Sequence, residues 1–169
     1  VRWFPSSKLN FAENLLRHGK GPLANEEAVI TVSEGMGRKA WTFSELRRDA
    51  GRVQRALSKL GVNEKESCGA YVANVGEAVV AMLGATSTGA TWTSCSPDFG
   101  ARAVADRFGQ VGPRVLFASD GACVGVPCLR RASWWTLEPF RGARSRRRRG
   151  GGGHVWSPRR HRRATTTPS

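Results

Sequence analysis

The chain has 169 residues and a formal net charge of +14, so it is long enough for one domain with a core and too short for a large two-domain enzyme. Residues 1–120 hold 15 Lys or Arg and 12 Asp or Glu, a net of +3, whereas residues 121–169 hold 12 Arg and one acid, a net of +11. The first segment therefore has the charge balance of an ordinary soluble globular protein, and the basicity belongs to the second. Because the sequence begins with Val1 rather than Met, we expect it to be a fragment.

Neither a membrane protein nor a disulfide-rich secreted protein is expected. No apolar run approaches the ~20 residues of a membrane span, and no secretory leader is present. Cys68 and Cys95 lie in or beside apolar runs, where a reduced cysteine behaves as a small hydrophobic residue. Cys123 and Cys128 lack the CxxC spacing of metal ligands, so we expect no zinc site. A reduced, cytoplasmic setting is the default expectation.

Four elements are expected in the first 60 residues. The stretch "LNFAENLLRHG" predicts a short helix, because Asn10 and Glu13 stand at capping-box spacing. The stretch "EAVITVSEGMGRKAWTF" predicts two strands joined by a glycine-containing turn. Thr42 and Glu45 form a second capping box, and apolar residues then recur at helical spacing, which predicts a helix over about 43–60.

Strand and helix patterns alternate between residues 67 and 119. The order is a strand at "SCGAYVA", a largely buried helix at "EAVVAMLGATSTG" that Asn74 can cap, a strand at "ATWTSC", a helix over about 101–110 and a strand at "RVLFAS". This alternation predicts an α/β fold with a parallel sheet covered by helices. The connections in such folds are right-handed, and ligands bind beyond the carboxyl ends of the strands. The loop "SCSPDFG" follows a strand and therefore falls at that end.

Four stretches of the sequence together resemble the amino-terminal part of the acetoacetyl-CoA synthetases, within the adenylate-forming acyl-CoA synthetase superfamily. They are "WFPSSKLNFAENLLRHG", "TFSELRRDAGRVQRALSKLGV", "EAVVAMLGATSTGATWTSCSPDFG" and "DRFGQVGPRVLFASDG". "FAENLL" is shared with acetyl-CoA synthetases, whereas "SCSPDFG" followed by "DRFGQ" is more specific to the acetoacetate enzymes. The resemblance covers residues 1–121. It departs from the family at "NEKESC", where a Gly-Asp-Arg-type turn is usual, and at Ala73, where proline is usual.

The resemblance implies ATP-dependent ligation of acetoacetate to coenzyme A through an acyl-adenylate, with ATP, Mg²⁺ and coenzyme A bound by the full-length enzymes. That chemistry needs a Gly- and Ser/Thr-rich phosphate loop with a lysine, an acidic metal ligand and a separate C-terminal domain. No "SGTTGxPK"-like stretch occurs in the sequence, and the "GGGG" at 150–153 lacks Ser, Thr and Lys. We therefore expect an incomplete N-terminal piece of the synthetase fold, without catalytic or metal-binding residues and without productive cofactor binding.

The candidate substrate-positioning residues lie in and after the strand "ATWTSC": Trp92, Ser94, Cys95, Ser96, Pro97, Asp98, Phe99 and Gly100. A serine or cysteine nucleophile would need a base within hydrogen-bond reach, usually histidine, and His18 is the sole histidine of residues 1–120. We therefore favour a loop that positions a ligand over a catalytic triad. Asp98 either caps the next helix, which we favour, or orients substrate or metal. Trp92 either belongs to the core or lines an acyl pocket.

Two groups of basic residues suggest phosphate binding. Arg38, Arg47 and Arg48 are candidates for the adenine-phosphate end of coenzyme A, because basic residues of this general region contact it in related synthetases; a solvated helix face is the favoured alternative. Residues 121–169 contain "RSRRRR" and "RRHRR", arginine runs of a kind that binds phosphates, which makes nucleic acid the alternative partner. Their composition changes abruptly where the resemblance ends, so we favour a frameshifted or alternatively spliced, irregular and disordered tail.

Overall fold

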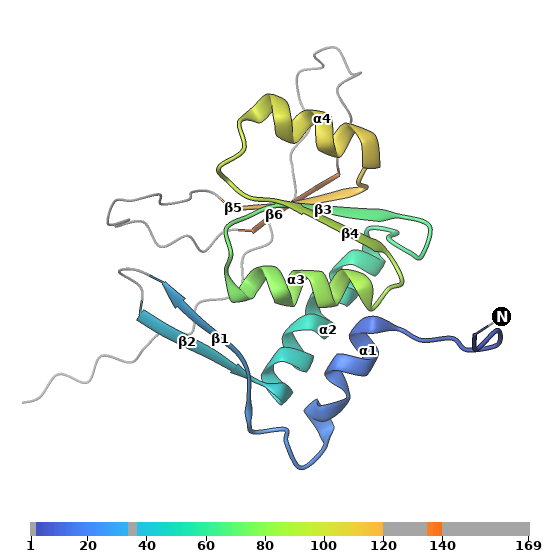
Figure 1. The fold of residues 1–169 in the computed structure, drawn as a ribbon, viewed down its shortest axis with the longest axis vertical. Helices are drawn as coiled ribbons and strands as arrows, with labels where there is room; N and C mark the ends of the chain where they lie inside the picture. The colour runs from blue at the N-terminus through green and yellow to red at the C-terminus, as the bar shows by residue number, and fades with distance from the viewer. Residues whose placement is uncertain (1–2, 34–36, 120–134, 140–169) are drawn as a thin grey trace, which may run out of the picture.

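The computed structural model describes residues 3–33, 37–119 and 135–139 (Figure 1). Over these residues the helices are α1 (Phe11–Leu16), the short 3-10 helix η1 (Arg17–Lys20), α2 (Phe43–Lys59), α3 (Gly76–Thr86) and α4 (Ala101–Val111). The strands are β1 (Glu27–Ser33), β2 (Gly37–Thr42), β3 (Ser67–Tyr71), β4 (Thr91–Cys95), β5 (Val115–Ser119) and β6 (Trp135–Pro139). Every helix and strand expected between residues 10 and 119 is therefore confirmed.

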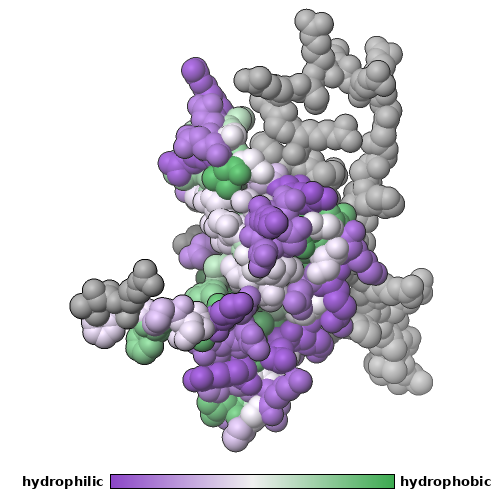
Figure 2. Space-filling view, turned by 90° about the vertical axis from the view of Figure 1, so that its right-hand side faces the viewer, coloured by the Kyte–Doolittle hydropathy of each residue, from purple (hydrophilic) through white to green (hydrophobic). Residues whose placement is uncertain are grey.

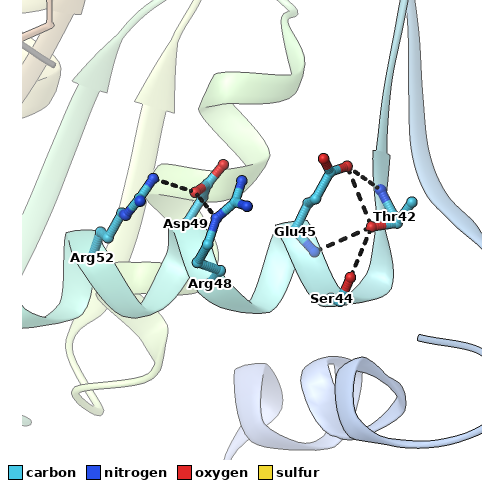
Figure 3. Close-up of polar contacts among 6 residues, drawn as sticks. All are labelled: Thr42, Ser44, Glu45, Arg48, Asp49 and Arg52. Carbon is cyan, nitrogen blue, oxygen red and sulfur yellow. Dashed lines mark hydrogen bonds and ion pairs between the residues drawn. The ribbon is translucent and has the colours of Figure 1, made fainter. Parts of the chain in front are cut away.

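Side-chain caps explain where two of the helices begin. The side-chain oxygen of Asn10 accepts from the Glu13 N–H at 3.0 Å and starts α1. At α2 the capping box is complete: Thr42 Oγ1 accepts from the Glu45 N–H at 3.2 Å, and Glu45 Oε2 accepts from the Thr42 N–H at 3.0 Å (Figure 3). One turn further on, Asp49 Oδ1 accepts from the guanidinium groups of two arginines on the same helix, which Figure 3 also shows.

The prediction that Asn74 caps α3 is wrong. The N-cap residue of α3 is Val75, and no side chain caps that end of the helix. The chain turns instead through a backbone hydrogen bond from the Val75 N–H to the Ala73 carbonyl at 2.9 Å. This tight backbone turn takes the place of a side-chain cap at the start of the helix.

The central layer is a four-stranded sheet with the order β4-β3-β5-β6. β3 pairs in parallel with both β4 and β5, as the alternating pattern predicted. Figure 1 shows α4 on one face of this sheet and α2 with α3 on the other. The antiparallel hairpin β1–β2 forms a separate two-stranded sheet beside α3. No helix of the described residues is long and apolar enough to cross a membrane.

The strand β6 lies within the segment that we expected to be irregular. It pairs antiparallel with β5, from Ser119↔Trp135 to Val115↔Pro139. The expectation is therefore corrected for these five residues. They form a strand because the open edge of β5 supplies backbone hydrogen-bond partners, a contact that the hydrophobic periodicity of the segment does not predict. Pro139 ends the strand at the sheet edge, where a residue without an N–H is tolerated. Cys123, Cys128 and the arginine runs fall outside the described residues.

Two apolar clusters form the core. The first lies between the sheet and the α2–α3 pair and includes Leu57, Cys68, Ala70, Ala85 and Phe117. The second joins α1, α2, α3 and the hairpin and is formed by Ala12, Leu16, Trp41, Leu46, Ala50, Val80 and Leu83. Small residues let these layers approach closely: a Cβ on Gly76 would lie 2.3 Å from the Trp41 ring. The hairpin is thus packed directly on the first turn of α3.

Full burial should make the contribution of Cys68 to stability depend on pH. Burial, with a smaller contribution from the Glu66 charge, raises the pKa of Cys68 from 9.0 to about 11. The thiol ionises in the unfolded chain first, so its contribution is present below pH 9 and is lost as the pH rises through 11. Wild type should therefore lose about 2–3 kcal/mol more unfolding free energy than Cys68→Ala over this range. Urea titrations of both proteins at pH 8 and at pH 11 measure this difference. If wild type and Cys68→Ala lost the same unfolding free energy between the two pH values, the prediction would be contradicted.

Candidate functional site

The chain switches from one face of the four-stranded sheet to the other at the carboxyl ends of β3 and β4. After β3 the chain turns to α3 on one face, and after β4 it turns to α4 on the opposite face (Figure 1). Open α/β sheets bind ligands beyond the carboxyl ends of their parallel strands. A hollow of about 270 Å³ lies at this place, and we call it the switch-point hollow.

The wall of the switch-point hollow is mainly apolar, with a few polar groups. Its residues are Val72, Ala73, Asn74, Val75, Ala78, Val79, Met82, Trp92, Ser94, Cys95 and Ser96. Among the residues that the structure describes, the wall contains no His, Asp, Glu, Lys or Arg, so these residues offer neither a histidine or carboxylate base nor a charged group that could stabilise a transition state. It can hold an apolar group and orient a polar one through Asn74, Ser94 and Ser96. The arrangement suits positioning rather than bond making.

The path of the loop after β4 is set by Tyr71, the last residue of β3. The Tyr71 hydroxyl lies 2.9 Å from the Pro97 carbonyl oxygen and 3.0 Å from the Phe99 carbonyl oxygen, so it can donate to either. On the other side, the Arg107 guanidinium of α4 packs over the Phe99 ring, 4.2 Å from the ring centroid. The loop is therefore fastened to both β3 and α4.

The structure brings half of the predicted loop residues into the site. Trp92, Ser94, Cys95 and Ser96 line the switch-point hollow, whereas residues 97–100 are not part of its wall. Trp92 lines the hollow, and its ring also packs against the core, 5.5 Å from the Phe117 ring. That these residues contact a ligand remains a prediction.

The favoured role of Asp98, capping α4, is wrong. The N-cap residue of α4 is Gly100, and no side chain caps this helix. Asp98 lies two residues too early, and its carboxylate instead accepts a hydrogen bond from Ser96 Oγ at 2.8 Å. This bond closes the loop on itself and holds the hydroxyl of a residue that lines the hollow. Asp98 therefore acts on the shape of the loop rather than on the start of the helix.

The structure separates the three candidate arginines for coenzyme A. Arg38 on β2 pairs with Glu27 on the neighbouring strand, and this hydrogen bond lowers the pKa of Glu27. Arg48 donates to Asp49 at 3.0 Å, which raises the pKa of Arg48. Arg47 and Arg48 line a second hollow on α2, and Arg38 is not among its residues. The three side chains therefore do not form one phosphate site, although they are close in the sequence.

The sequence reasoning missed the side of the hollow formed by the segment after β3. Asn74, Val79 and Met82 belong to its wall, and Tyr71 anchors the facing loop. A usable signal existed: the predicted parallel sheet places the residues after β3 at the same edge as those after β4. A tyrosine at the end of an apolar strand also offers a polar tip that needs a hydrogen-bond partner when it is buried.

Comparisons with known proteins agree with this geometry. The profile of the family described as "AMP-binding enzyme" matches residues 20–144. The acetoacetyl-coenzyme A synthetase of Rhizobium meliloti (strain 1021) is 42% identical over 122 residues, 72% of this chain and 18% of the relative. The malonamoyl-CoA synthetase of Penicillium aethiopicum is 41% identical over 120 residues, 70% of this chain and 17% of the relative.

Among solved structures, the acetoacetyl-CoA synthetase from Streptomyces lividans superposes with a TM-score of 0.68 and 44% sequence identity. The superposition covers 71% of this chain and 18% of that protein. The chain therefore spans less than a fifth of the length of each of these three relatives. The family profile continues past residue 120, where the change in composition placed a boundary, and it includes β6.

Proposed function

Because the chain belongs to the AMP-binding enzyme family, we propose that it is the amino-terminal part of an acyl-CoA ligase. Such an enzyme joins a carboxylic acid to coenzyme A at the expense of ATP, through an acyl-adenylate. The observation that carries the proposal is the switch-point hollow, an apolar site with three polar groups on the sheet that the chain shares with an acetoacetyl-CoA synthetase. The loop of residues 92–100 then positions a ligand of the complete enzyme.

For the acid, we propose a small carboxylate with a second carbonyl at the β position. Acetoacetate is the first candidate, because the Rhizobium and Streptomyces relatives carry it in their names. Malonamate is the alternative, because the Penicillium relative is almost equally similar. Both acids place a carbonyl carbon two bonds from the carboxylate carbon, and they differ only in the group on that carbonyl, which is methyl in acetoacetate and amino in malonamate. The sequence identities to the two relatives, 42% and 41%, do not discriminate between the two acids.

The chain as it stands is proposed to lack ligase activity. Within the described part of the chain, the wall of the switch-point hollow carries no charged residue, and no group of three or more His, Cys, Asp or Glu could hold a metal. The switch-point hollow therefore does not fit Mg²⁺ or a triphosphate, whose charge needs cationic or metal partners. Binding of MgATP and adenylation are therefore assigned to parts of the longer relatives that this chain does not match.

A chimera tests the proposed function. Residues 1–119 are joined to the corresponding remainder of the Streptomyces lividans enzyme, and AMP release is measured with acetoacetate, with malonamate and with neither acid. We expect acid-dependent AMP release from the chimera and none from the 169-residue chain. A folded but inactive chimera would contradict the family role of this segment. Acid-dependent AMP release by the chain alone would contradict its proposed incompleteness.

For residues 121–169 we propose a change of reading frame or splicing rather than a selected nucleic-acid-binding tail. The support is compositional, since 12 of the chain's 27 Lys and Arg residues fall there and all 12 are Arg. Sequencing the transcript across codons 115–130 should reveal a second frame that continues towards a phosphate loop. A transcript that encodes the arginine-rich tail without interruption would overturn this proposal and favour nucleic-acid binding through residues 141–163.

A further inference from the structure

A second hollow, of about 630 Å³, lies between η1 and α2, at the end of α3 opposite to the switch-point hollow. We call it the basic hollow because the described part of its wall has one carboxylate, that of Glu13, against four cationic side chains, those of Lys20, Arg47, Arg48 and Arg55. Figure 2 views the molecule from the side on which α1 lies and shows hydrophilic residues over much of its lower half. The basic hollow shares no residue with the switch-point hollow, on which the proposed function rests.

The cations of the basic hollow are only partly neutralised. Arg48 is engaged by Asp49, which Arg52 also contacts. The other nearby carboxylate of α2, Glu45, is turned to the backbone of Thr42. Within residues 3–33 and 37–119, neither Lys20 nor Arg55 has an ion-pair or hydrogen-bond partner. Two exposed cations are therefore available to an anion that enters the hollow.

Arg47 is held in place at the wall of the same hollow. Its Nη1 donates to the Leu16 carbonyl oxygen at 3.0 Å, which fixes the guanidinium and leaves other N–H groups free for a ligand. Gly19 makes room for the side chain, because a Cβ there would lie 2.8 Å from Arg47 Cβ. A guanidinium that is already oriented loses less conformational entropy when it binds an oxyanion. Ser44 and Gln54 add neutral donors to the wall.

We propose that the basic hollow binds a small ligand that carries two or more phosphate groups. One fixed arginine and two free cations around a space of about 630 Å³ suit several negative charges on one small molecule. Such a group occurs in free pyrophosphate, in nucleotides and in coenzyme A. The proposal does not depend on the ligase function, since it concerns binding alone.

The test uses the whole 169-residue chain, labelled with ¹⁵N, and pyrophosphate as the probe. Total binding cannot decide the matter, because the arginine runs of residues 144–163 also attract phosphate. The amide shifts of Gly19, Ser44 and Ser87 report on the basic hollow directly. We expect these shifts to saturate, and the affinity to fall as sodium chloride is raised, since salt screens exposed charges.

A pair of charge-matched variants isolates the site. Lys20→Gln with Arg55→Gln removes two cations that form no ion pair or hydrogen bond in the described structure, so the fold should persist and the affinity at these amides should fall roughly tenfold. Lys65→Gln with Arg102→Gln removes the same charge elsewhere and should leave the affinity unchanged. Equal affinities for the two variants, or no saturating shift at these amides, would overturn the proposal.

Further titrations identify the source of the phosphate groups. Tighter binding of coenzyme A than of its 3′-dephospho form supports the proposal and assigns the hollow to coenzyme A. Equal binding of ADP and pyrophosphate supports it as a site for diphosphates in general. Inorganic phosphate binding as tightly as pyrophosphate would overturn the requirement for two phosphate groups.

Discussion

Replacement of Phe108 by alanine is expected to lower the free energy of unfolding by about 3–5 kcal/mol, the usual cost of removing a large buried aromatic ring. Phe108 is 1% exposed and is the one buried residue of α4. It packs on β3 at Gly69, where a Cβ would lie 3.3 Å from the ring. Because domains of this size are stable by about 5–15 kcal/mol, the variant should retain only part of its stability.

Urea denaturation followed by circular dichroism measures this loss, and Val111→Ala is the matched control. Val111 belongs to the same helix but is 41% exposed, so its truncation should cost less than about 1 kcal/mol. Amide exchange adds a local readout, since α4 should lose protection before the α2–α3 pair. Similar losses for the two variants would show that Phe108 does not anchor the helix.

Replacement of Gly84 by alanine should also destabilise the fold, although alanine is the better helix former. A Cβ on Gly84 would lie 2.5 Å from both Cβ and Cγ1 of Val53 and 3.0 Å from the Ala50 carbonyl oxygen. A branched side chain and a backbone group cannot give way cheaply, so α2 and α3 must move apart. Overpacking of this kind costs about 1–3 kcal/mol or more, which exceeds the gain of about 1 kcal/mol in helix propensity.

Gly51→Ala, on the same helix pair, is expected to change the free energy of unfolding in the opposite direction. Gly51 lies within α2, and the nearest atom to an added Cβ is the tip of the flexible Arg55 side chain at 3.6 Å. This change should stabilise the protein by about 0.5–1 kcal/mol. Thermal unfolding of the two variants should therefore shift in opposite directions. A shift of the same sign in both would mean that propensity, rather than the approach of the helices, controls these positions.

Much of the fold could be predicted from local signals. The capping box of Thr42 and Glu45 and the apolar spacing behind it define α2, because both act within one helix. The alternation of strands and helices also predicted the parallel sheet, and with it the edge at which the switch-point hollow lies. These features depend on neighbours in the sequence and on general rules of connection, so one sequence is enough to infer them.

The features that the sequence reasoning missed depend on contacts between distant residues. Tyr71 anchors a loop 26 residues further along the chain. No sequence pattern around either residue predicts this contact. Arg38 and Arg47 are near in the sequence but lie on a strand and a helix with different partners, so proximity misled. Asp98 is of a residue type that often caps helices, but the N-cap position of α4 is occupied by Gly100. The pairing of β6 likewise depends on the open edge of β5.

The anchoring of the loop by Tyr71 bears on how this site can diverge in evolution. The hydroxyl contacts the carbonyl oxygens of Pro97 and Phe99, which are backbone atoms that every amino acid provides. The course of the loop therefore depends little on which side chains it carries. Residues 94–96 can therefore be exchanged while the main chain keeps its place. One tyrosine hydroxyl on β3 would thus let the wall of the switch-point hollow change by point mutation while the loop stays in position.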